Sequence, residues 1–197
     1  MRSSHSELLA AWRLCVVTQA HVLHLRSDSS MQQEPEDVQL TTQQLSHVVD
    51  VWPVARLGTV HPSGAPQLVP IVCVVDMGLI YTPIDGKPKR NAVLQRLRNV
   101  AQSAAVCVLL DHYDEDWQAL WWLRVDGIAE LLSDEPAHAG AFARVERLLR
   151  AKYPQYSDVQ VFRPPPRMLR VTPTRHAAWS AQPMDWLRLT GRSARIA

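Results

Sequence analysis

The chain lacks the residue patterns that mark several large enzyme classes. Its 197 residues include only seven glycines, and no G-x-G-x-x-G follows an apolar run, so the usual dinucleotide-binding fingerprint is excluded. Neither G-x-S-x-G nor H-E-x-x-H occurs, which removes the common signatures of serine hydrolases and zinc proteases. Any catalytic chemistry must therefore come from another kind of site.

Charge and cysteine content are also low. The formal net charge of +2 is too small by itself to indicate a nucleic-acid partner. Cys15, Cys73 and Cys107 lie far apart. We predict that the last two, in apolar runs, are buried free thiols in a reducing cytoplasm. The apolar run 8–25 is broken by arginine and histidine, so no membrane partner is expected.

The composition is that of a globular protein, with 47% hydrophobic and 20% charged residues. We expect a poorly ordered extension at 1–38, one folded domain at 39–180 and a loose, slightly basic tail at 181–197. For residues 1–30, three explanations stay open at this point: a mobile extension, an over-extended start and a poor signal peptide.

Apolar periodicity predicts a mainly β chain with small helices. Thr41-Thr42-Gln43-Gln44 resembles a capping box that opens a short helix ending before Pro53. Strands are expected at 54–60, 66–75, 79–83, 106–111, 120–132 and 168–179, and further helices at 91–101 and from Asp134.

The turns between these strands indicate how the strands are arranged. Gly-containing turns join the first three, which favours an antiparallel meander. The strand 106–111 is apolar enough to be buried on both faces, and a bulge is expected near Gly127. Six strands with few helices favour a closed or split barrel over a parallel α/β fold.

A basic loop follows the third strand and precedes a helix. Lys87, Lys89 and Arg90 lie in it, and Arg96 and Arg98 follow shortly after. Backbone N–H groups and the helix dipole favour a phosphate at such a position. A solvated helix face explains the same charges equally well, so both interpretations stay open.

Proline and tryptophan add two further signals. Pro66 and Pro70 cannot donate ladder hydrogen bonds, so their strand is a plain edge or an opening for a planar ligand. Trp121 and Trp122 must point to opposite faces, which places one in the core and lets the other contact a subunit. Trp179, after the last strand, borders a ring-shaped ligand or plugs a barrel end.

The loop from Asp111 to Asp116 gathers four acids and His112. Their spacing matches no known ligand pattern, so we predict no metal site.

Four stretches together resemble the pyridoxamine-phosphate-oxidase-like (PPOX class) split β-barrel family, and are most similar to its probable coenzyme F420-dependent branch. They are ARLGTVHPSGAPQLVPI, GLIYTPIDGKPKR with LQRLRN, DHYDEDWQALWWLRVDG and LRVTPTRHAAW. The resemblance covers about residues 51–179. It implies an α+β, six-stranded antiparallel split β-barrel of the FMN-binding type, and a homodimer with two cofactor sites at the subunit interface.

The resemblance also implies a set of cofactor-binding residues. The strand carrying Gln67, Val69 and Pro70 would lie along the ring system, and Thr82 would face the cofactor. Phosphate would be held by Lys87, Lys89 and Arg90, with Trp179 closing the last strand, and Trp121, Trp122 or Arg124 could reach the partner's site. The chain lacks the arginine-rich strand and the C-terminal substrate segment of pyridoxamine-phosphate oxidases, so vitamin salvage is not expected.

The expected function is therefore an F420-dependent oxidoreductase that transfers a hydride between the deazaflavin and an unsaturated small molecule. Arg96 and Arg98 could meet the acidic tail of this cofactor. No catalytic residue is assigned, although Tyr81 and His61 are candidate proton donors. Two alternatives stay open: an FMN-dependent enzyme, and a non-enzymatic flavin- or haem-binding barrel with His112 or His176 as axial ligand.

Overall fold

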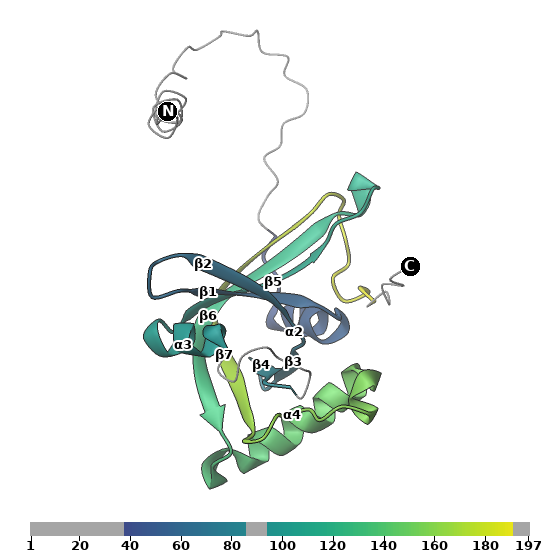
Figure 1. The fold of residues 1–197 in the computed structure, drawn as a ribbon. Helices are drawn as coiled ribbons and strands as arrows, with labels where there is room; N and C mark the ends of the chain where they lie inside the picture. Colours follow the sequence, from purple (N-terminus) through teal and green to yellow (C-terminus); the bar gives the residue numbers. More distant parts are fainter. Residues whose placement is uncertain (1–37, 86–93, 191–197) are drawn as a thin grey trace, which may run out of the picture. The chain divides into compact units, whose positions relative to one another are not determined.

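The computed structural model of the chain describes residues 38–85 and 94–190. Within them, seven strands form one antiparallel sheet in the order β2-β1-β5-β6-β7-β4-β3 (Figure 1). The strands are β1 (Ala55–Val60), β2 (Pro66–Ile71), β3 (Val74–Asp76), β4 (Leu79–Pro83), β5 (Ala105–His112), β6 (Trp121–Ser133) and β7 (Arg167–Ser180). The helices are α2 (Thr42–Val51), α3 (Gln95–Gln102) and α4 (Ala139–Lys152), with 3-10 turns at Trp117–Ala119, Pro136–His138 and Pro154–Ser157.

This architecture confirms the mainly β prediction and corrects the strand count from six to seven. The run predicted as one strand at 66–75 is divided at Val72-Cys73 into β2 and β3. The predicted antiparallel pairings of neighbouring runs occur, β1 with β2 and β3 with β4. The division of the middle run places these two pairs at opposite edges of the sheet, so the three runs do not form one continuous meander. Pro70 lies on an edge strand, as its missing N–H requires.

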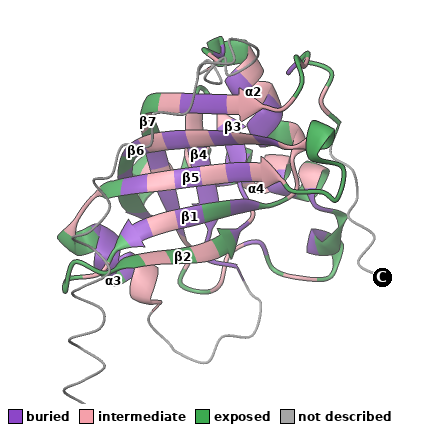
Figure 2. Cartoon of the chain, turned by 90° about the horizontal axis from the view of Figure 1, so that it is seen from above, coloured by how far each residue is buried: buried purple, intermediate pink, exposed green. Residues whose placement is uncertain are grey.

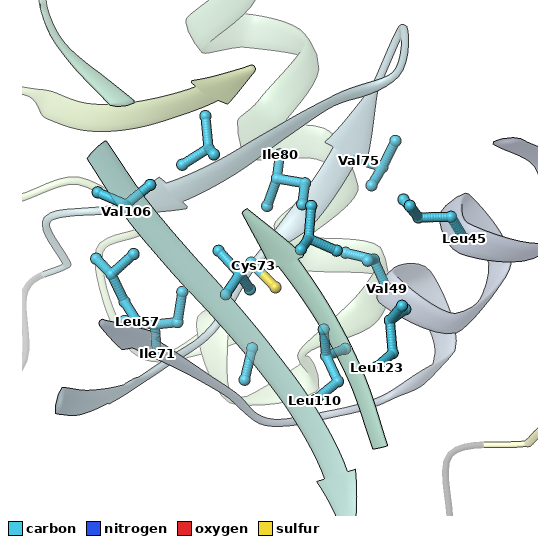
Figure 3. Packing of buried hydrophobic residues seen from close by; sticks show 14 of the residues in the cluster. Leu45, Val49, Leu57, Ile71, Cys73, Val75, Ile80, Val106, Leu110 and Leu123 are labelled. Carbon is cyan, nitrogen blue, oxygen red and sulfur yellow. The ribbon is translucent and has the colours of Figure 1, made fainter. Parts of the chain in front are cut away.

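The two edge strands of the sheet, β2 and β3, are joined by only two residues. Such a short connection spans roughly 10 Å, so the sheet must curl until its two edges lie close together. The edges do not pair, and the barrel therefore stays open between them. Its interior holds the larger apolar core, in which the Cys73 thiol lies among side chains from α2 and several strands (Figure 3).

A second core lies between the sheet and α4. It includes Phe142, Val145 and Leu149 of the helix, together with Tyr81 and Met168 from β4 and β7. The helix thus covers the outer side of this part of the sheet (Figure 1). The outer side of β2, β1 and β5, together with the parts of β6 and β7 away from α4, has no described helix in front of it (Figure 2).

Local signals in the sequence account for several of these elements. The capping box is confirmed, because Gln44 N donates to Thr41 Oγ1 at 3.2 Å and Thr41 N donates to Gln44 Oε1 at 2.9 Å. A bulge occurs between Asp126 and Gly127, as predicted. The strand β5 is not buried on both faces, however, since its exposure alternates along the chain. The apolar sequence of β5 therefore does not show that another element of this chain covers the outer face of the strand.

The burial of individual side chains refines three further expectations. Trp121 is buried in the barrel core and Trp122 is half-buried on the opposite face. Cys73 is buried, but Cys107 is only half-buried, which corrects that part of the thiol prediction. Trp186, from the segment expected to be a loose tail, is 2% exposed and packs in the core. No described helix is both long and apolar enough to cross a membrane.

Candidate functional site

The predicted phosphate loop lies between β4 and α3. Lys87, Lys89 and Arg90 fall outside the described residues, so the structure shows the two flanks of the loop. On one flank, Asp85 is buried and accepts a hydrogen bond from the Tyr156 hydroxyl at 3.4 Å. Burial raises the pKa of Tyr156, and the nearby Asp85 charge and hydrogen bond act in the same direction. This flank is thus firmly anchored in the second core.

The other flank is the first turn of α3. Its N-cap residue, Leu94, supplies no side-chain hydrogen bond to the helix N–H groups, and the first N–H groups of a helix need partners from outside the helix. Arg96 follows in the same turn and is half-buried. Desolvation lowers its pKa, an effect that the Asp85 charge opposes. Its Nε atom has no hydrogen-bond partner among the described residues.

An amide network connects α3 to the edge strand β2. Asn99 is fully buried, and its Nδ2 atom donates at 2.9 Å to both Thr59 Oγ1 and Gln67 Oε1. Its Oδ1 atom accepts from Gln95 Nε2 at 3.0 Å. These bonds fix the side chain of Gln67 relative to the helix that follows the phosphate loop. Nothing in the sequence spacing of these four residues predicted the network.

The three residues expected on β2 do not share one face. Gln67 and Val69 are half-buried and belong to the inward-facing set, and Val69 packs against the barrel core. Pro70 is exposed on the outer face, opposite Arg56 of β1. Thr82 is 1% exposed, on the barrel-facing side of β4 with Ile80. Of these four positions, Gln67 is thus the polar one that keeps partial access to solvent.

The uncovered outer face of the sheet carries a hollow with a volume of about 710 Å³. Apolar groups line most of it, including Gly58, Leu68 and Ile128. Its charged rim contains Asp126, which pairs with Arg175 at 2.9 Å and with Arg124 at 3.4 Å. Figure 2 shows the strands that form this face side by side. The face combines exposed apolar area with paired charges.

A second hollow of about 370 Å³ lies on the same face, towards the ends of β6 and β7. Trp122 and Trp179 are cross-strand partners there, and Tyr113 and Arg124 complete the wall. The arrangement can hold a flat group between aromatic rings beside a cation. Trp179 therefore borders this hollow.

One protomer does not bring Trp179 and Gln67 together. Their strands are four pairing steps apart in the order β2-β1-β5-β6-β7, which is about 19 Å along the sheet at the usual strand spacing. Trp179 is also displaced along β7 from Arg175. Arg175 lies in the row of Leu68, the neighbour of Gln67, through the pairs of Gly58, Cys107 and Asp126. The residues expected from the resemblance thus lie in two separate groups within one chain.

The histidines and acids of the loop after β5 are used in local pairs. Asp111 is paired with Arg56, and His112 Nε2 lies 3.3 Å from Asp114 Oδ2. His176 Nε2 accepts a hydrogen bond from Leu40 N at 3.1 Å. Among residues 38–85 and 94–190, no group of three His, Cys, Asp or Glu side chains is arranged to hold a metal ion.

The two candidate proton donors lie away from both of these groups. Tyr81 is 3% exposed and packs in the second core, under α4. His61 is at the tip of the β1–β2 hairpin, where its Nδ1 atom lies 2.8 Å from Ser63 Oγ and accepts from Ser63 N. Neither is positioned next to Gln67, Arg96 or Trp179 by any described contact.

Comparison with known proteins gives a family match and several similar folds. A family model described as pyridoxamine 5'-phosphate oxidase matches residues 41–180, more than half of the chain. The solved structure of the conserved hypothetical protein Rv2991 from Mycobacterium tuberculosis is similar with a TM-score of 0.59 and 20% identity, covering 83% of this chain and 100% of that one. No curated protein matches.

Two other solved structures show the same fold. An FAD-binding protein from Mesorhizobium loti has a TM-score of 0.54 and 17% identity over 71% of this chain and 94% of its own. The haem storage protein HutZ from Vibrio cholerae has a TM-score of 0.51 and 13% identity over 70% of this chain and 92% of its own. At these identities the likeness extends to the fold alone.

Proposed function

The chain belongs to the pyridoxamine 5'-phosphate oxidase family, and on this premise we propose that it is an oxidoreductase that binds the deazaflavin coenzyme F420. When bound, this cofactor supplies a hydride to an electron-poor, unsaturated small molecule. The protein binds and orients the cofactor and shields the reacting ring from water. The absence of a catalytic triad in the sequence is consistent with this division of roles.

The observation that carries the proposal is the open first turn of α3. Its cap provides no side-chain acceptor, and Arg96 in that turn keeps an unpaired Nε atom within the described part of the chain. Helix N–H groups and a guanidinium together favour an anion. Lys87, Lys89 and Arg90 precede this turn directly in the sequence, so four cations are available for the phosphate and the acidic tail of F420.

The edge strand β2 supports the placement of the ring system. One side of an edge strand leaves backbone N–H and C=O groups unpaired, and such groups can bond to the polar edge of a flat heterocycle. Gln67, on this strand, is tied by Asn99 to the same helix that carries Arg96. Ring and phosphate would thus be held by elements that are fixed to one another.

A second copy of the chain would complete the site. The half-site with Trp122 and Trp179 lies about 19 Å along the sheet from Gln67, too far for both to contact one ring from the same protomer. The intervening outer face is uncovered and exposes Val60, Leu68 and Ile128, as expected of an association surface. We therefore propose a homodimer in which this face is the interface.

The haem alternative gains no support from the histidines. His176 uses its Nε2 atom as an acceptor for Leu40 N, and His112 pairs through Nε2 with Asp114. FMN remains the second candidate, because it shares a phosphate and a ring with F420. The two cofactors differ in the acidic tail, which Arg98, exposed on α3, could contact only in F420.

The proposal is tested by titrating the purified protein with F420 and, separately, with FMN, following cofactor fluorescence. We expect F420 to bind more tightly. Binding of FMN alone would reject the F420 assignment. A Lys87→Ala/Lys89→Ala double variant should weaken binding at least tenfold if both lysines contact phosphate, and an unchanged affinity would remove the loop from the site.

A further inference from the structure

Asn99 is the centre of a hydrogen-bond chain whose direction is set by three amide groups. The helix presents Leu97, Asn99 and Val100 to the interior, and Asn99 alone of these is polar. A buried amide is unfavourable unless its groups are bonded, and here both its atoms have partners. Packing alone would be served better by leucine.

The direction of the bonds determines which end of Gln67 is used. Gln95 Nε2 donates to Asn99 Oδ1, so Asn99 Nδ2 must face Thr59 and Gln67. The Oε1 atom of Gln67 therefore accepts the hydrogen bond from Asn99 Nδ2. Its Nε2 atom makes no hydrogen bond to any described residue, and the side chain is only half-buried. Gln67 thus presents two open N–H donors at the edge strand.

We propose that Asn99 is a positioning residue that turns the Gln67 amide so that its N–H group, not its carbonyl, meets the bound ring. The inference rests on the proposed function, because it takes the edge strand β2 as the place of the ring. A fixed N–H donor selects an acceptor on the ligand. Deazaflavins and flavins both carry such acceptors in the two carbonyl oxygens of their pyrimidinedione ring.

The selectivity follows from the cost of mismatched hydrogen-bonding groups. A ligand that presented its own N–H to Gln67 would face a donor, and the amide could not rotate without breaking its bond to Asn99. Leaving buried polar groups unpaired discriminates strongly between otherwise similar ligands. Gln67 would therefore select the edge of the ring that faces β2.

Two substitutions of Gln67 test its role as a donor. Gln67→Glu keeps an acceptor for Asn99 Nδ2 but has no N–H when ionised, and Gln67→Met removes the polar group without adding charge. We expect each to weaken binding of F420, or of FMN if that is the cofactor, by about tenfold, as for one lost hydrogen bond with its partner left unpaired. Gln102→Glu, exposed at the end of α3, adds the same charge at a distance from the strand and should bind as the wild type.

Asn99→Asp tests the positioning. A carboxylate can only accept hydrogen bonds, so the substituted side chain would draw the Gln67 N–H group inward and turn the Gln67 carbonyl towards the ring. We expect about a tenfold loss of affinity in the wild-type background and no further loss in the Gln67→Met background, because both changes remove the same bond.

The outcomes separate this inference from the proposed function. Wild-type affinity in Gln67→Met would show that Gln67 donates nothing to the cofactor. An equal loss from Asn99→Asp in both backgrounds would show that Asn99 acts through the fold alone. Failure of the wild-type protein to bind either F420 or FMN would overturn the proposed function itself, and this inference with it.

Discussion

The Nζ atom of Lys152 donates to the carbonyl oxygen of Cys73 at 2.8 Å, and so connects the end of α4 to the point where the barrel is open. The same Nζ atom donates to Val49 O at 2.5 Å. The Tyr153 hydroxyl accepts from Cys73 N and donates to Cys73 O, both at 3.1 Å. Side chains thus replace the strand partners that the backbone lacks there.

The Tyr153 hydroxyl should contribute measurably to stability. Tyr153→Phe leaves the N–H of Cys73 unpaired in a buried position, and we expect the free energy of unfolding to fall by about 2 kcal/mol. Urea denaturation measures the change. Tyr156→Phe is the matched control, because the Tyr156 hydroxyl makes a longer contact of 3.4 Å to Asp85, and it should cost less. An equal or smaller loss for Tyr153→Phe would contradict the bridging role.

Lys152 should make stability depend on pH on the alkaline side. Desolvation lowers its pKa, while the charges of Cys73 and Asp50 partly oppose this. The unfolded chain keeps this proton up to a pH of about 10.5, whereas the folded protein loses it at a lower pH. Between these two pKa values the unfolded chain binds more protons, so the free energy of unfolding rises with pH.

The comparison with Lys152→Met isolates this effect. We expect the stability difference between wild type and variant to grow as the pH is raised from about 7 towards about 10. Tyr153, whose pKa is raised by burial, is present in both proteins and so cancels. Because the Lys152 charge also lowers the pKa of Cys73, both proteins are compared in a Cys73→Ala background. A difference that stays constant over this range would show that Lys152 titrates normally.

Gly127 should tolerate no side chain. A Cβ atom there would lie 2.6 Å from Thr172 O and 2.8 Å from Val171 Cγ1, at the bulge between β6 and β7. We expect Gly127→Ala to lower the free energy of unfolding by about 2 kcal/mol. Gly58→Ala is the control, since its Cβ would lie 3.5 Å from Cys107 O in ordinary contact. Similar thermal midpoints for the two variants would contradict this steric argument.

The proposed interface makes a prediction about oligomeric state. Leu68 is 62% exposed on the uncovered face, and Leu68→Glu would place a charge in the interface. We expect the wild-type protein to sediment as a dimer and this variant as a monomer. Met77→Glu changes another exposed apolar residue, in the β3–β4 turn, and should leave the dimer intact. A dimeric Leu68→Glu variant would place the interface elsewhere.

Arg96 should contribute to cofactor affinity more than other arginines on the surface. Arg96→Gln removes a half-buried cation from the first turn of α3, and we expect about a tenfold weaker binding of the anionic cofactor. Arg147→Gln removes a cation from α4 and should have no effect on the same fluorescence titration. Equal affinities of the two variants would remove Arg96 from the site.

Local chemistry made several features predictable from the sequence. The Thr41–Gln44 capping box, the bulge at Gly127 and the edge position of Pro70 each depend on a few neighbouring residues. The opposite orientations of Trp121 and Trp122 follow from the two-residue period of a strand. For the same reason the mainly β class could be predicted, since alternation and turn residues act over short distances.

The interruption at Val72-Cys73 shows what local patterns miss. The run from Pro66 to Val75 is largely apolar, and nothing within it marks the change from one sheet edge to the other. Its partners are Asp50, Lys152 and Tyr153, which are distant in sequence. The prediction that β5 is buried on both faces was wrong for a related reason. Apolar residues occur on covered and on uncovered faces of a sheet, so their presence does not show which of the two a face is.

The sequence by itself determined the element types, the family resemblance and the basic loop at Lys87, Lys89 and Arg90. The tertiary structure decided that Gln67 and Trp179 lie on strands four pairing steps apart, and that Asn99 joins Gln67 to α3. Strand order and side-chain orientation set these relationships. Both arise when distant segments pack together, and neither is encoded in the spacing of residues along the chain.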